Sequence, residues 1–361
     1  MKIGLLTFHY GSNYGGVLQA YALQQTLSFL GHDTWIINFR PKDKFKQFLI
    51  VTSGCLRKRK FKELFFYLSH FRHCQKIFEH FCNQYLRQTT PAFSEKDLRK
   101  LDFDVISVGS DQVWNISQQK YKTYFLGWIK GNQIRRISYA ACCGKNIVDS
   151  IYKAALVDQL SSFYSLSVRS KESQLFIKSL LGKDVPIVAD PTMLYDFSEF
   201  CSGKNNGGYI LTYVLTGDIK GGNDVAINEI KRKYPSLPVY SILISDRIPR
   251  LCDWADKQLV DITPNEWVNL IYNCAFMFTD SFHGSVFAMK FNKPLIAYYN
   301  GDISGRRFID LRAQFDMQNV VTDVEKLKGV LNNDDETKYC YSDRIVAIRK
   351  ASLDYLTKAM K

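Results

Sequence analysis

The segment from Cys274 to Tyr299, CAFMFTDSFHGSVFAMKFNKPLIAYY, constrains the fold more than any other part of the chain. Its apolar run, 275–279, is short enough for a buried parallel strand, and a helical stretch follows it. Pro294 then restarts the chain as a second buried strand, 295–299. This succession of strand, tight turn, helix and strand predicts an open α/β sheet.

Polar residues follow the first of these strands directly. Asp280 or Ser281 is a natural N-cap for the helix, and His283 and Gly284 lie in its first turn. Open α/β sheets bind ligands at the carboxyl ends of their strands, and a helix N-terminus attracts phosphate or carboxylate. We therefore expect an anion site with His283 beside it. The alternative is that Asp280 only caps the helix and His283 is a hydrogen-bonded turn histidine.

The length of 361 residues favours two domains of ordinary size. Ser, Gly and Asn gather at 202–208, which predicts a linker. We expect a first domain at 1–201, a second at 208–335, and a C-terminal helix at 340–361 that packs back on the first domain.

Composition excludes several classes of protein. No apolar run approaches the roughly 20 residues that span a bilayer, and the N-terminus leads straight into a strand, so we expect a cytoplasmic protein. The nine cysteines show no CxxC pair and no zinc spacing, which predicts reduced thiols and no metal centre. No cofactor is expected.

The net charge of +13 is concentrated in one helix-rich insertion, about 41–90. From Arg40 to Arg87 the sequence has 12 Lys or Arg against 3 acids, interleaved with aromatic residues. Such a segment can bind an anionic membrane surface, which would place the protein peripherally on the inner face of the cell membrane. The alternative is an aromatic core face with a solvated basic face. No nucleic-acid-binding signature supports a nucleic acid partner.

A first strand, 2–8, leads into a glycine loop and a helix at 17–30. The loop glycines are Gly11, Gly15 and Gly16, which is not the dinucleotide-binding spacing GxGxxG. The loop nevertheless follows a strand, and glycine lets a ligand approach the backbone closely. We expect Asn13, Tyr14 and the backbone of Gly15 and Gly16 to contact a ligand there.

A later strand, 103–108, ends in a second polar loop. Ser110, Asp111 and Gln112 could hydrogen-bond sugar hydroxyls there, and Trp114 could offer a stacking face. The alternative is a turn closed by Asp111 with a buried tryptophan.

Three arginines also follow predicted strands. Arg169 closes the strand 165–168, where a guanidinium can clamp a carboxylate or phosphate with two hydrogen bonds. Its alternative is a surface arginine paired with Glu172. Arg306 and Arg307 lie just beyond the strand that ends at Tyr299, also on the expected ligand side.

Six motifs in order resemble the polysaccharide pyruvyl transferase family, from about Gly4 to Arg312. They are NYGGVLQAYALQ, FDVISVGSDQVW, ISYAACCG, SVRS, VADPTMLY and TDSFHGSVFAMKFNKPLIAYY. The resemblance implies two Rossmann-like domains facing across a cleft, as in GT-B glycosyltransferases. It also implies a phosphoenolpyruvate donor, a glycan acceptor, and a ketal product with release of inorganic phosphate.

The residues can be matched to that chemistry. Forming the ketal needs one proton shuttle, for which His283 is the candidate, and several positive groups for the donor's carboxylate and phosphate. The helix N-terminus at 281–284, with Ser281, Phe282 and Gly284, is expected to bind the donor together with Arg169 and either Arg306 or Arg307. With this resemblance, the second domain is expected to bind the donor and the first to bind the acceptor, which is a glycan, free or lipid-linked, in surface polysaccharide assembly. The residues expected to bind the acceptor are Asn13, Tyr14, Gly15, Gly16, Ser110, Asp111, Gln112 and Trp114.

The chain departs from the resembled pattern at two points. In SVRS, Ser170 stands where an acidic residue often follows the arginine, and the second departure concerns the expected donor site. Members often carry Arg-Leu-His where this sequence has Ser281-Phe282-His283. Either Arg306 or Arg307 replaces the missing arginine, or the donor differs. Two alternatives therefore stay open: a GT-B glycosyltransferase that uses a nucleotide sugar, and a non-catalytic homologue that binds a glycan carrier. A dinucleotide oxidoreductase is disfavoured because neither half has the glycine fingerprint.

Overall fold

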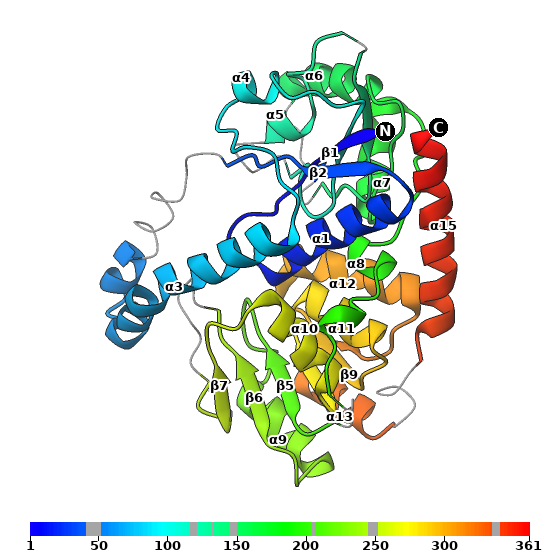
Figure 1. The fold of residues 1–361 in the computed structure, drawn as a ribbon. Coiled ribbons are helices and arrows are strands. Elements are labelled where there is room, and N and C mark those ends of the chain that lie inside the picture. Colours follow the sequence, from blue (N-terminus) through cyan, green and yellow to red (C-terminus); the bar gives the residue numbers. More distant parts are fainter. Residues whose placement is uncertain are drawn as a thin grey trace. The chain divides into compact units, whose positions relative to one another are not determined.

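The protein was examined as a computed structural model, which describes residues 1–40, 52–115, 121–131, 133–143, 150–203, 207–244, 252–333 and 340–361 (Figure 1). The chain forms two compact units. Unit 1 comprises Met1–Asp43, Phe81–Asp196 and Val346–Lys361, and unit 2 comprises Lys44–His80 and Phe197–Ile345. The division therefore falls five residues before the end of the expected first domain. The described part of the basic insertion up to His80 belongs to unit 2, although we expected it in the first domain.

Unit 1 is built on a parallel sheet with the strand order β2-β1-β3-β4. The four strands are short and mostly buried: β1 Lys2–Leu6, β2 Asp33–Ile36, β3 Val105–Val108 and β4 Arg135–Ser138. Single parallel bridges extend the sheet through Ser165 and Val168 to Ile187. The chain builds the sheet outward from β1 in both directions, so the order reverses between β1 and β3, where such sheets bind ligands.

Helices cover this sheet, and most of them start where the sequence supplies a cap. The helices are α1 Tyr14–Phe29, α4 Glu95–Leu98, α5 Tyr121–Tyr124, α6 Ser150–Ser161, α7 Lys171–Leu181 and α8 Pro191–Leu194. The N-cap of α1 is Asn13, whose side chain accepts from the N–H of Gly16, so the helix starts three residues earlier than we expected. The two glycines of the expected loop therefore lie in the first turn of α1.

Unit 2 contains a six-stranded parallel sheet in the order β10-β9-β8-β5-β6-β7. Its strands are β5 Ile210–Tyr213, β6 Val239–Ile242, β7 Lys257–Leu259, β8 Phe276–Thr279, β9 Leu295–Tyr298 and β10 Val320–Val321. Counted from β5, this is the 3-2-1-4-5-6 order of the Rossmann fold. The order reverses between β5 and β8, and β8 is the strand that the sequence placed before His283.

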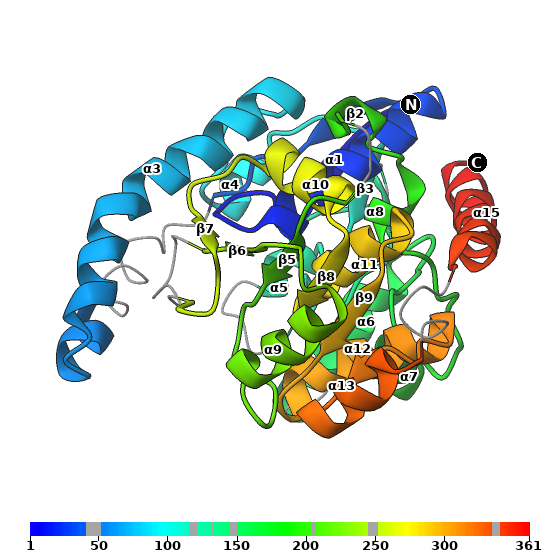
Figure 2. The ribbon, with the colours of Figure 1, turned by 90° about the horizontal axis from the view of Figure 1, so that it is seen from below.

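Helices flank this sheet on both faces (Figure 2). They are η1 Ser198–Phe200, α9 Asn223–Lys233, α10 Pro264–Asn273, α11 Phe282–Lys290, α12 Gly301–Phe315 and α13 Val324–Leu331. On one face α9 packs against α13, while on the other α10 packs against α11 through Trp267 and Phe287, whose ring centroids are 5.1 Å apart. The start of α10 is fixed by Thr263 and Glu266, which cap each other's backbone N–H groups.

Two long helices have residues in both units: α3 Phe61–Tyr85 and α15 Ser342–Met360. In unit 1, the Tyr355 hydroxyl donates to the backbone oxygen of Ser138 at 2.8 Å, and the N–H of Ala189 donates to Ser352 Oγ at 2.9 Å. The C-terminal part of α15 is therefore attached to the unit 1 sheet by buried polar contacts. None of the helices in the described ranges is long and apolar enough to cross a membrane.

Replacing Ser352 tests this attachment. The Ser352 side chain is fully buried, so Ser352→Ala leaves the Ala189 N–H without its acceptor and should destabilise the protein by about 1–3 kcal/mol. Thr357→Ala is the matched control, because that exposed hydroxyl bonds only to Leu353 in its own helix. Urea unfolding of both variants measures the difference, and equal, small losses would contradict the docking of α15 described above.

Candidate active site

The carboxylate of Asp280 joins the two strands between which the order of the unit 2 sheet reverses. It follows β8 directly, is buried, and accepts hydrogen bonds from the backbone N–H groups of Leu215 and Thr216, which follow β5, and from the Thr216 hydroxyl. Thr279 Oγ1 adds a second link by donating to the backbone oxygen of Tyr213. The loop after β5 and the turn after β8 are therefore fixed to each other.

Ser281 is the N-cap of α11, which resolves the choice between Asp280 and Ser281. Its Oγ accepts from the N–H of Gly284 at 3.1 Å. A Cβ at Gly284 would lie only 3.0 Å from both Met277 Cε and Thr279 Oγ1, so the glycine permits close packing of the helix on β8. Because the N–H of Gly284 already donates to the Ser281 side chain, Gly284 serves the packing of the turn. No contact of Gly284 among the described residues points to a role in donor binding.

Phe282 and His283 form the remainder of this first turn. Each side chain is 7% exposed, and their rings meet edge to face with centroids 5.2 Å apart. His283 therefore lies where the positive end of the α11 dipole and the outward N–H groups of its first turn favour an anion.

Arg306 and Arg307 lie in a helix, where we expected a loop. The helix α12 starts at Gly301, directly after β9, and β9 is the neighbour of β8 in the sheet. Arg306 is exposed. Arg307 is half-buried, and its Nε is buried without a hydrogen-bond partner among the described residues. A buried guanidinium N–H without an acceptor is costly, so Arg307 is the arginine of the pair that is better suited to receive an anion.

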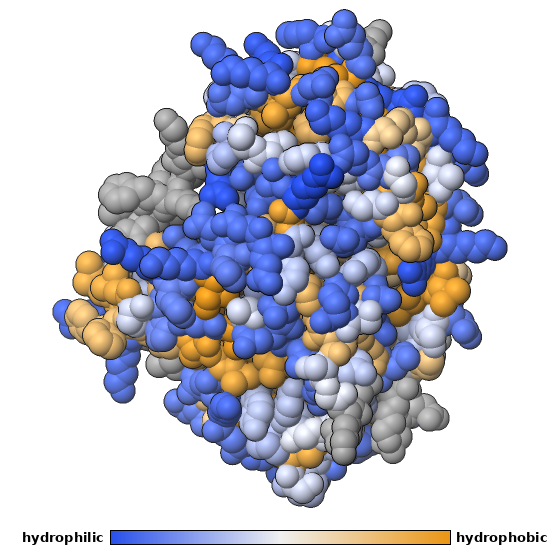
Figure 3. All heavy atoms as spheres, viewed as in Figure 1, coloured by the Kyte–Doolittle hydropathy of each residue, from blue (hydrophilic) through white to orange (hydrophobic). Residues whose placement is uncertain are grey.

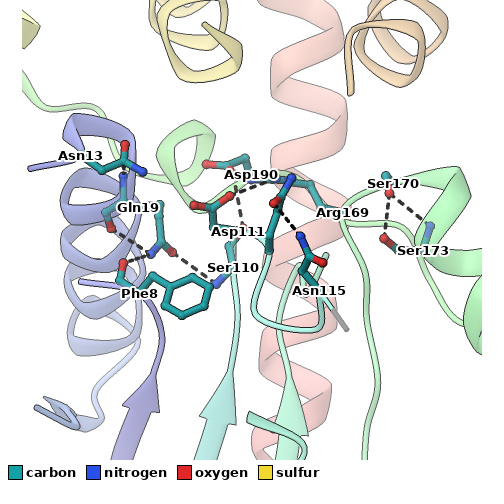
Figure 4. A network of polar contacts seen from close by, with 12 residues as sticks. Phe8, Asn13, Gln19, Ser110, Asp111, Asn115, Arg169, Ser170, Ser173 and Asp190 are labelled. Atoms are coloured by element: carbon teal, nitrogen blue, oxygen red, sulfur yellow. Dashed lines mark hydrogen bonds and ion pairs between the residues drawn. The ribbon is translucent and has the colours of Figure 1, made fainter. Parts of the chain in front are cut away.

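The carboxyl edge of the unit 1 sheet is held together by Gln19 of α1 (Figure 4). Its amide nitrogen contacts the Thr7 hydroxyl at 2.8 Å and the backbone oxygens of Phe8 and Gly16, and its Oε1 accepts from the N–H of Ser110 at 3.2 Å. One buried side chain thus joins the residues after β1 to those after β3. Sequence analysis missed Gln19, although a glutamine among apolar helix residues was a signal.

Arg169 lies in a buried ion cluster in unit 1. Its guanidinium donates to Asp190 at 2.7 Å and pairs with Asp111 at 3.5 Å. Burial alone would lower the pKa of Arg169, but nearby Cys142, Asp190 and Asp111 raise it further than burial lowers it. The group is therefore always charged, and two carboxylates surround it. Arg169 is therefore not a surface arginine, and its charge is already balanced within the cluster.

The other predicted unit 1 residues differ in how far they can reach a ligand. Ser110 is fully buried, and its hydroxyl donates to Asp190 at 3.3 Å. Asp111 and Gln112 are partly exposed beside it, and Asn13 is exposed at the start of α1. The polar groups that remain open to an acceptor are therefore those of Asn13, Asp111 and Gln112.

Tyr14, Gly15 and Gly16 are buried in the first turn of α1. Their contribution is to the packing of that turn, with Tyr14 only 3% exposed.

Trp114 is a core residue and not a stacking face. Its side chain is fully buried, its Nε1 donates to the backbone oxygen of Tyr124 at 3.1 Å, and its ring stacks on Phe125. The apolar core of unit 1 surrounds it. A ring without exposed surface cannot stack on a sugar, so the alternative of a buried tryptophan is correct.

His9 is a second buried residue of the unit 1 edge that sequence analysis did not select. Its Nδ1 donates to the backbone oxygen of Thr7 at 3.1 Å, and its Nε2 lies 3.3 Å from the side-chain oxygen of Asn38. Burial lowers the pKa of His9 from 6.5 to about 4, against the opposing effect of these two hydrogen bonds. His9 is therefore neutral near pH 7 and serves as a fixed part of the scaffold.

The predicted residues thus fall into two groups, one in each unit. Ser281, Phe282, His283 and Gly284 share one turn in unit 2, next to the strand that leads to Arg306 and Arg307. Arg169 and the predicted acceptor residues belong to unit 1. Within the described ranges, no cluster of three or more His, Cys, Asp or Glu could hold a metal ion.

Comparisons with known proteins give a family and a fold. The sequence model of the polysaccharide pyruvyl transferase family matches residues 13–302. The search among curated proteins found no match.

Three solved structures illustrate the fold. UDP-GlcNAc 2-epimerase from Neisseria meningitidis, bound to UDP-GlcNAc, is 11% identical, with a TM-score of 0.54 over 99% of this chain and 100% of that one. Anabaena Alr3699/HepE, in complex with UDP and glucose, is 12% identical, with a TM-score of 0.52 over 100% and 97%. The Methanocaldococcus jannaschii UDP-GlcNAc 2-epimerase is 14% identical, with a TM-score of 0.52 over 97% and 100%. At these identities the likeness concerns the fold alone, and it confirms the predicted α/β class with GT-B-like, Rossmann-like domains.

Replacing Arg169 tests the ion cluster. Arg169→Ala leaves the buried carboxylate of Asp190 and the partly exposed one of Asp111 without their cation and should destabilise the protein by about 3–5 kcal/mol, while Arg169→Lys should cost less. Lys178→Ala, which removes an exposed ion pair with Asp184 in the same unit, should cost at most about 1 kcal/mol. Urea unfolding measures all three, and an Arg169→Ala loss no larger than that of the control would contradict the cluster.

Neutral His9 should make stability depend on pH. Because its pKa is about 4 in the folded protein and 6.5 ordinarily, the unfolded chain takes up the proton first as the pH falls. The stabilisation is complete above pH 6.5 and is lost toward pH 4, with about 2 kcal/mol lost by pH 5. The free energies of unfolding of wild type and His9→Gln should therefore converge between pH 7 and pH 5. A constant difference would show that His9 does not titrate as described.

Proposed function

The chain belongs to the polysaccharide pyruvyl transferase family, and we propose that it transfers the pyruvyl group of phosphoenolpyruvate to a sugar diol of a glycan. The product is a pyruvate ketal, and the reaction serves surface polysaccharide biosynthesis. The observation that carries the proposal is the place of His283, in the first turn of α11 at the point where the unit 2 sheet reverses its strand order. There a histidine stands beside a helix N-terminus that suits an anionic donor.

Phosphoenolpyruvate carries a carboxylate and a phosphate, and unit 2 offers groups for both. The first turn of α11, which follows the Ser281 cap, provides backbone N–H groups and the positive end of a helix dipole, while the N–H of Ser281 itself donates to Thr279 Oγ1. The half-buried guanidinium of Arg307 can provide a cation. It lies on α12, the helix that follows β9, and β9 is the neighbour of β8 in the sheet. We assign to Arg307 the place of the arginine that the family often carries two residues before the histidine, with Arg306 as the exposed member of the pair.

The chemistry requires one proton shuttle. The donor's methylene carbon takes a proton and becomes a methyl group, while a sugar hydroxyl attacks the central carbon. Phosphate then leaves with the electrons of its C–O bond, and the second hydroxyl closes the ketal. The two hydroxyl protons end on the methyl carbon and on the phosphate. We assign the delivery and uptake of these protons to His283, because imidazole exchanges protons readily near neutral pH.

We place acceptor binding in unit 1. Asp111, Gln112 and Asn13 are polar and at least partly exposed at the carboxyl edge of the sheet, where sugar hydroxyls can exchange hydrogen bonds with them. Four of the other predicted residues are buried and support this edge by packing: Tyr14, Gly15, Gly16 and Ser110. Arg169 is proposed to act as a positioning residue, since it fixes Asp111 through their ion pair. The acceptor is a glycan, free or lipid-linked.

Two other functions are tested together with this one. A glycosyltransferase would bind a nucleotide sugar; among the fold neighbours, the Neisseria meningitidis epimerase is bound to UDP-GlcNAc and Arabidopsis thaliana UGT89C1 to UDP-L-rhamnose. A non-catalytic homologue would bind a glycan carrier without turnover. Both alternatives are motivated by the absence of the arginine before Phe282. The family match, together with the position of His283 at the helix start, favours pyruvyl transfer over them.

Turnover should depend on His283. With phosphoenolpyruvate and a glycan acceptor, the wild type should release inorganic phosphate, and His283→Ala should lower kcat by about 10²–10⁴, the usual value of a general acid or base. His80→Ala replaces an exposed histidine of α3 and is the matched control. Phosphate release and unfolding curves are measured on the same preparations.

The outcomes separate the candidate functions. Release of a nucleoside diphosphate from a nucleotide sugar, with no phosphate from phosphoenolpyruvate, would replace the proposal with the glycosyltransferase. Glycan binding without either product would favour the non-catalytic homologue. An equal loss in His283→Ala and His80→Ala would remove His283 from the chemistry.

A further inference from the structure

The first half of α3 carries a row of exposed apolar side chains. Phe61, Phe65 and Leu68 follow one another at helical spacing and are 63%, 77% and 50% exposed. Leu56, just before the helix, is 55% exposed. Figure 3 shows hydrophobic residues gathered at the lower left, where Figure 1 draws the beginning of α3. Single exposed apolar side chains are common on protein surfaces, but a cluster of them indicates a contact surface.

The opposite stripe of the same helix is buried. Tyr67, Cys74 and Phe78 are at most 4% exposed, and His70 pairs with Asp261 of the same unit. The buried stripe accounts for how α3 is held, so the exposed row is not required for the fold of the helix. Aromatic side chains on the solvent side of a fixed helix are therefore available to a partner.

Positive charge surrounds the row. Between Leu56 and Lys76 the sequence has seven Lys or Arg and one acidic residue, Glu63. All seven of these cations are exposed in the structure. Apart from Lys60, which has a further contact, they are Arg57, Lys58, Arg59, Lys62, Arg72 and Lys76. The surface thus combines an apolar strip with a positive border. We call Phe61, Phe65 and Leu68, together with these six cations, the docking face.

We propose that the docking face binds the surface of an anionic lipid bilayer. Aromatic and aliphatic side chains enter the boundary between head groups and acyl chains, while Lys and Arg stay at the head groups and attract anionic lipids. The bilayer offers both chemistries at the depth that one helix face can reach. Each feature alone would bind weakly, and the two together make reversible attachment without a membrane span.

Two other partners fit the docking face less well. A second copy of the chain would bring the same cations against each other, and like charges oppose such contact. A nucleic acid would supply phosphates and could stack bases on Phe61 and Phe65, but it offers no apolar layer for Leu68 or Leu56. The bilayer is the partner whose charge and apolar layer both complement the face.

This inference does not depend on the reaction assigned above. Attachment would bring unit 2, which contains the described residues 52–80, to a surface on which lipid-linked glycans are displayed. The attachment itself is measured without donor or acceptor. Failure to bind vesicles would therefore leave the pyruvyl transfer proposal untouched, and failure of the transfer would leave the docking face untouched.

Co-sedimentation of the full chain with vesicles tests the docking face. Wild type should bind vesicles of phosphatidylcholine with phosphatidylserine, bind pure phosphatidylcholine at least tenfold more weakly, and be released as salt rises. The triple variant Phe61→Ser/Phe65→Ser/Leu68→Ser should lose at least tenfold in partitioning. The variant Arg57→Gln/Lys58→Gln/Lys62→Gln should lose a similar amount and also lose most of the salt dependence.

Matched controls change the same residue types elsewhere on the protein. Phe29→Ser replaces a side chain that is 93% exposed at the end of α1, and Arg349→Gln/Lys350→Gln neutralises two exposed cations of α15. Both should bind vesicles like the wild type, and all variants should show the wild-type unfolding curve. Equal losses in controls and docking-face variants would overturn the proposal.

Three further results would also overturn it. The first is that the wild type does not bind anionic vesicles. The second is that the protein binds a single-stranded oligonucleotide, and the triple variant loses this binding but still binds vesicles. The third is that light scattering shows a dimer, which the triple variant converts to a monomer without a change in vesicle binding. A Phe65→Trp reporter gives an independent reading. Its fluorescence should be quenched by brominated lipids in anionic vesicles, and no quenching would contradict insertion of this row.

Discussion

The hydrogen bonds that Asp280 accepts from the loop after β5 are the contacts on which the candidate site depends. A buried carboxylate requires partners, and here two backbone N–H groups and the Thr216 hydroxyl supply them. Because the strand order reverses between β5 and β8, the helices that follow them leave on different faces, and Asp280 joins the loop after β5 to the start of α11. The first turn of α11, with His283, is then held against the sheet by the Ser281 cap and the close approach at Gly284.

Unit 1 solves the same problem with different residues. Gln19 joins the ends of β1 and β3. The ion cluster joins Arg169 and Asp190, which follow the bridged positions Val168 and Ile187, to Asp111 in the loop after β3. Both units therefore place a buried polar network beneath the carboxyl edge of a parallel sheet. Buried networks of this kind are costly when incomplete, so they define one arrangement of the loops above them. Partly exposed groups such as Asp111 and Gln112 are thereby presented from a rigid base.

Local patterns made a large part of this architecture predictable. The apolar run before Asp280 acts over a few residues, and it predicted β8 at 275–279, one residue longer than the observed Phe276–Thr279. The strands β7 and β10 are short, with three and two residues, and carry too little pattern to be recognised. The basic insertion was recognised by composition, but its assignment to a unit depends on the pairing of His70 with Asp261, 191 residues away.

The residues that were harder to interpret depend on contacts between distant parts of the chain. Arg169 meets Asp190 across 21 residues, and Gln19 meets Ser110 across 91. Neither contact has a local pattern. Trp114 follows a strand among polar residues, which suits both a ligand site and a core, and only its burial decides between them. Sequence reasoning located the carboxyl edges of both sheets, while the roles of individual side chains there required the tertiary structure.

In the proposed function, unit 2 binds a small donor with two anionic groups and not a nucleotide sugar. Isothermal titration calorimetry of the purified chain with phosphoenolpyruvate, and separately with UDP-sugars, tests it most directly. The account predicts saturable binding of phosphoenolpyruvate that Arg307→Ala weakens at least tenfold, with no binding of UDP-sugars. Saturable binding of a UDP-sugar without binding of phosphoenolpyruvate would contradict it and would keep only the fold.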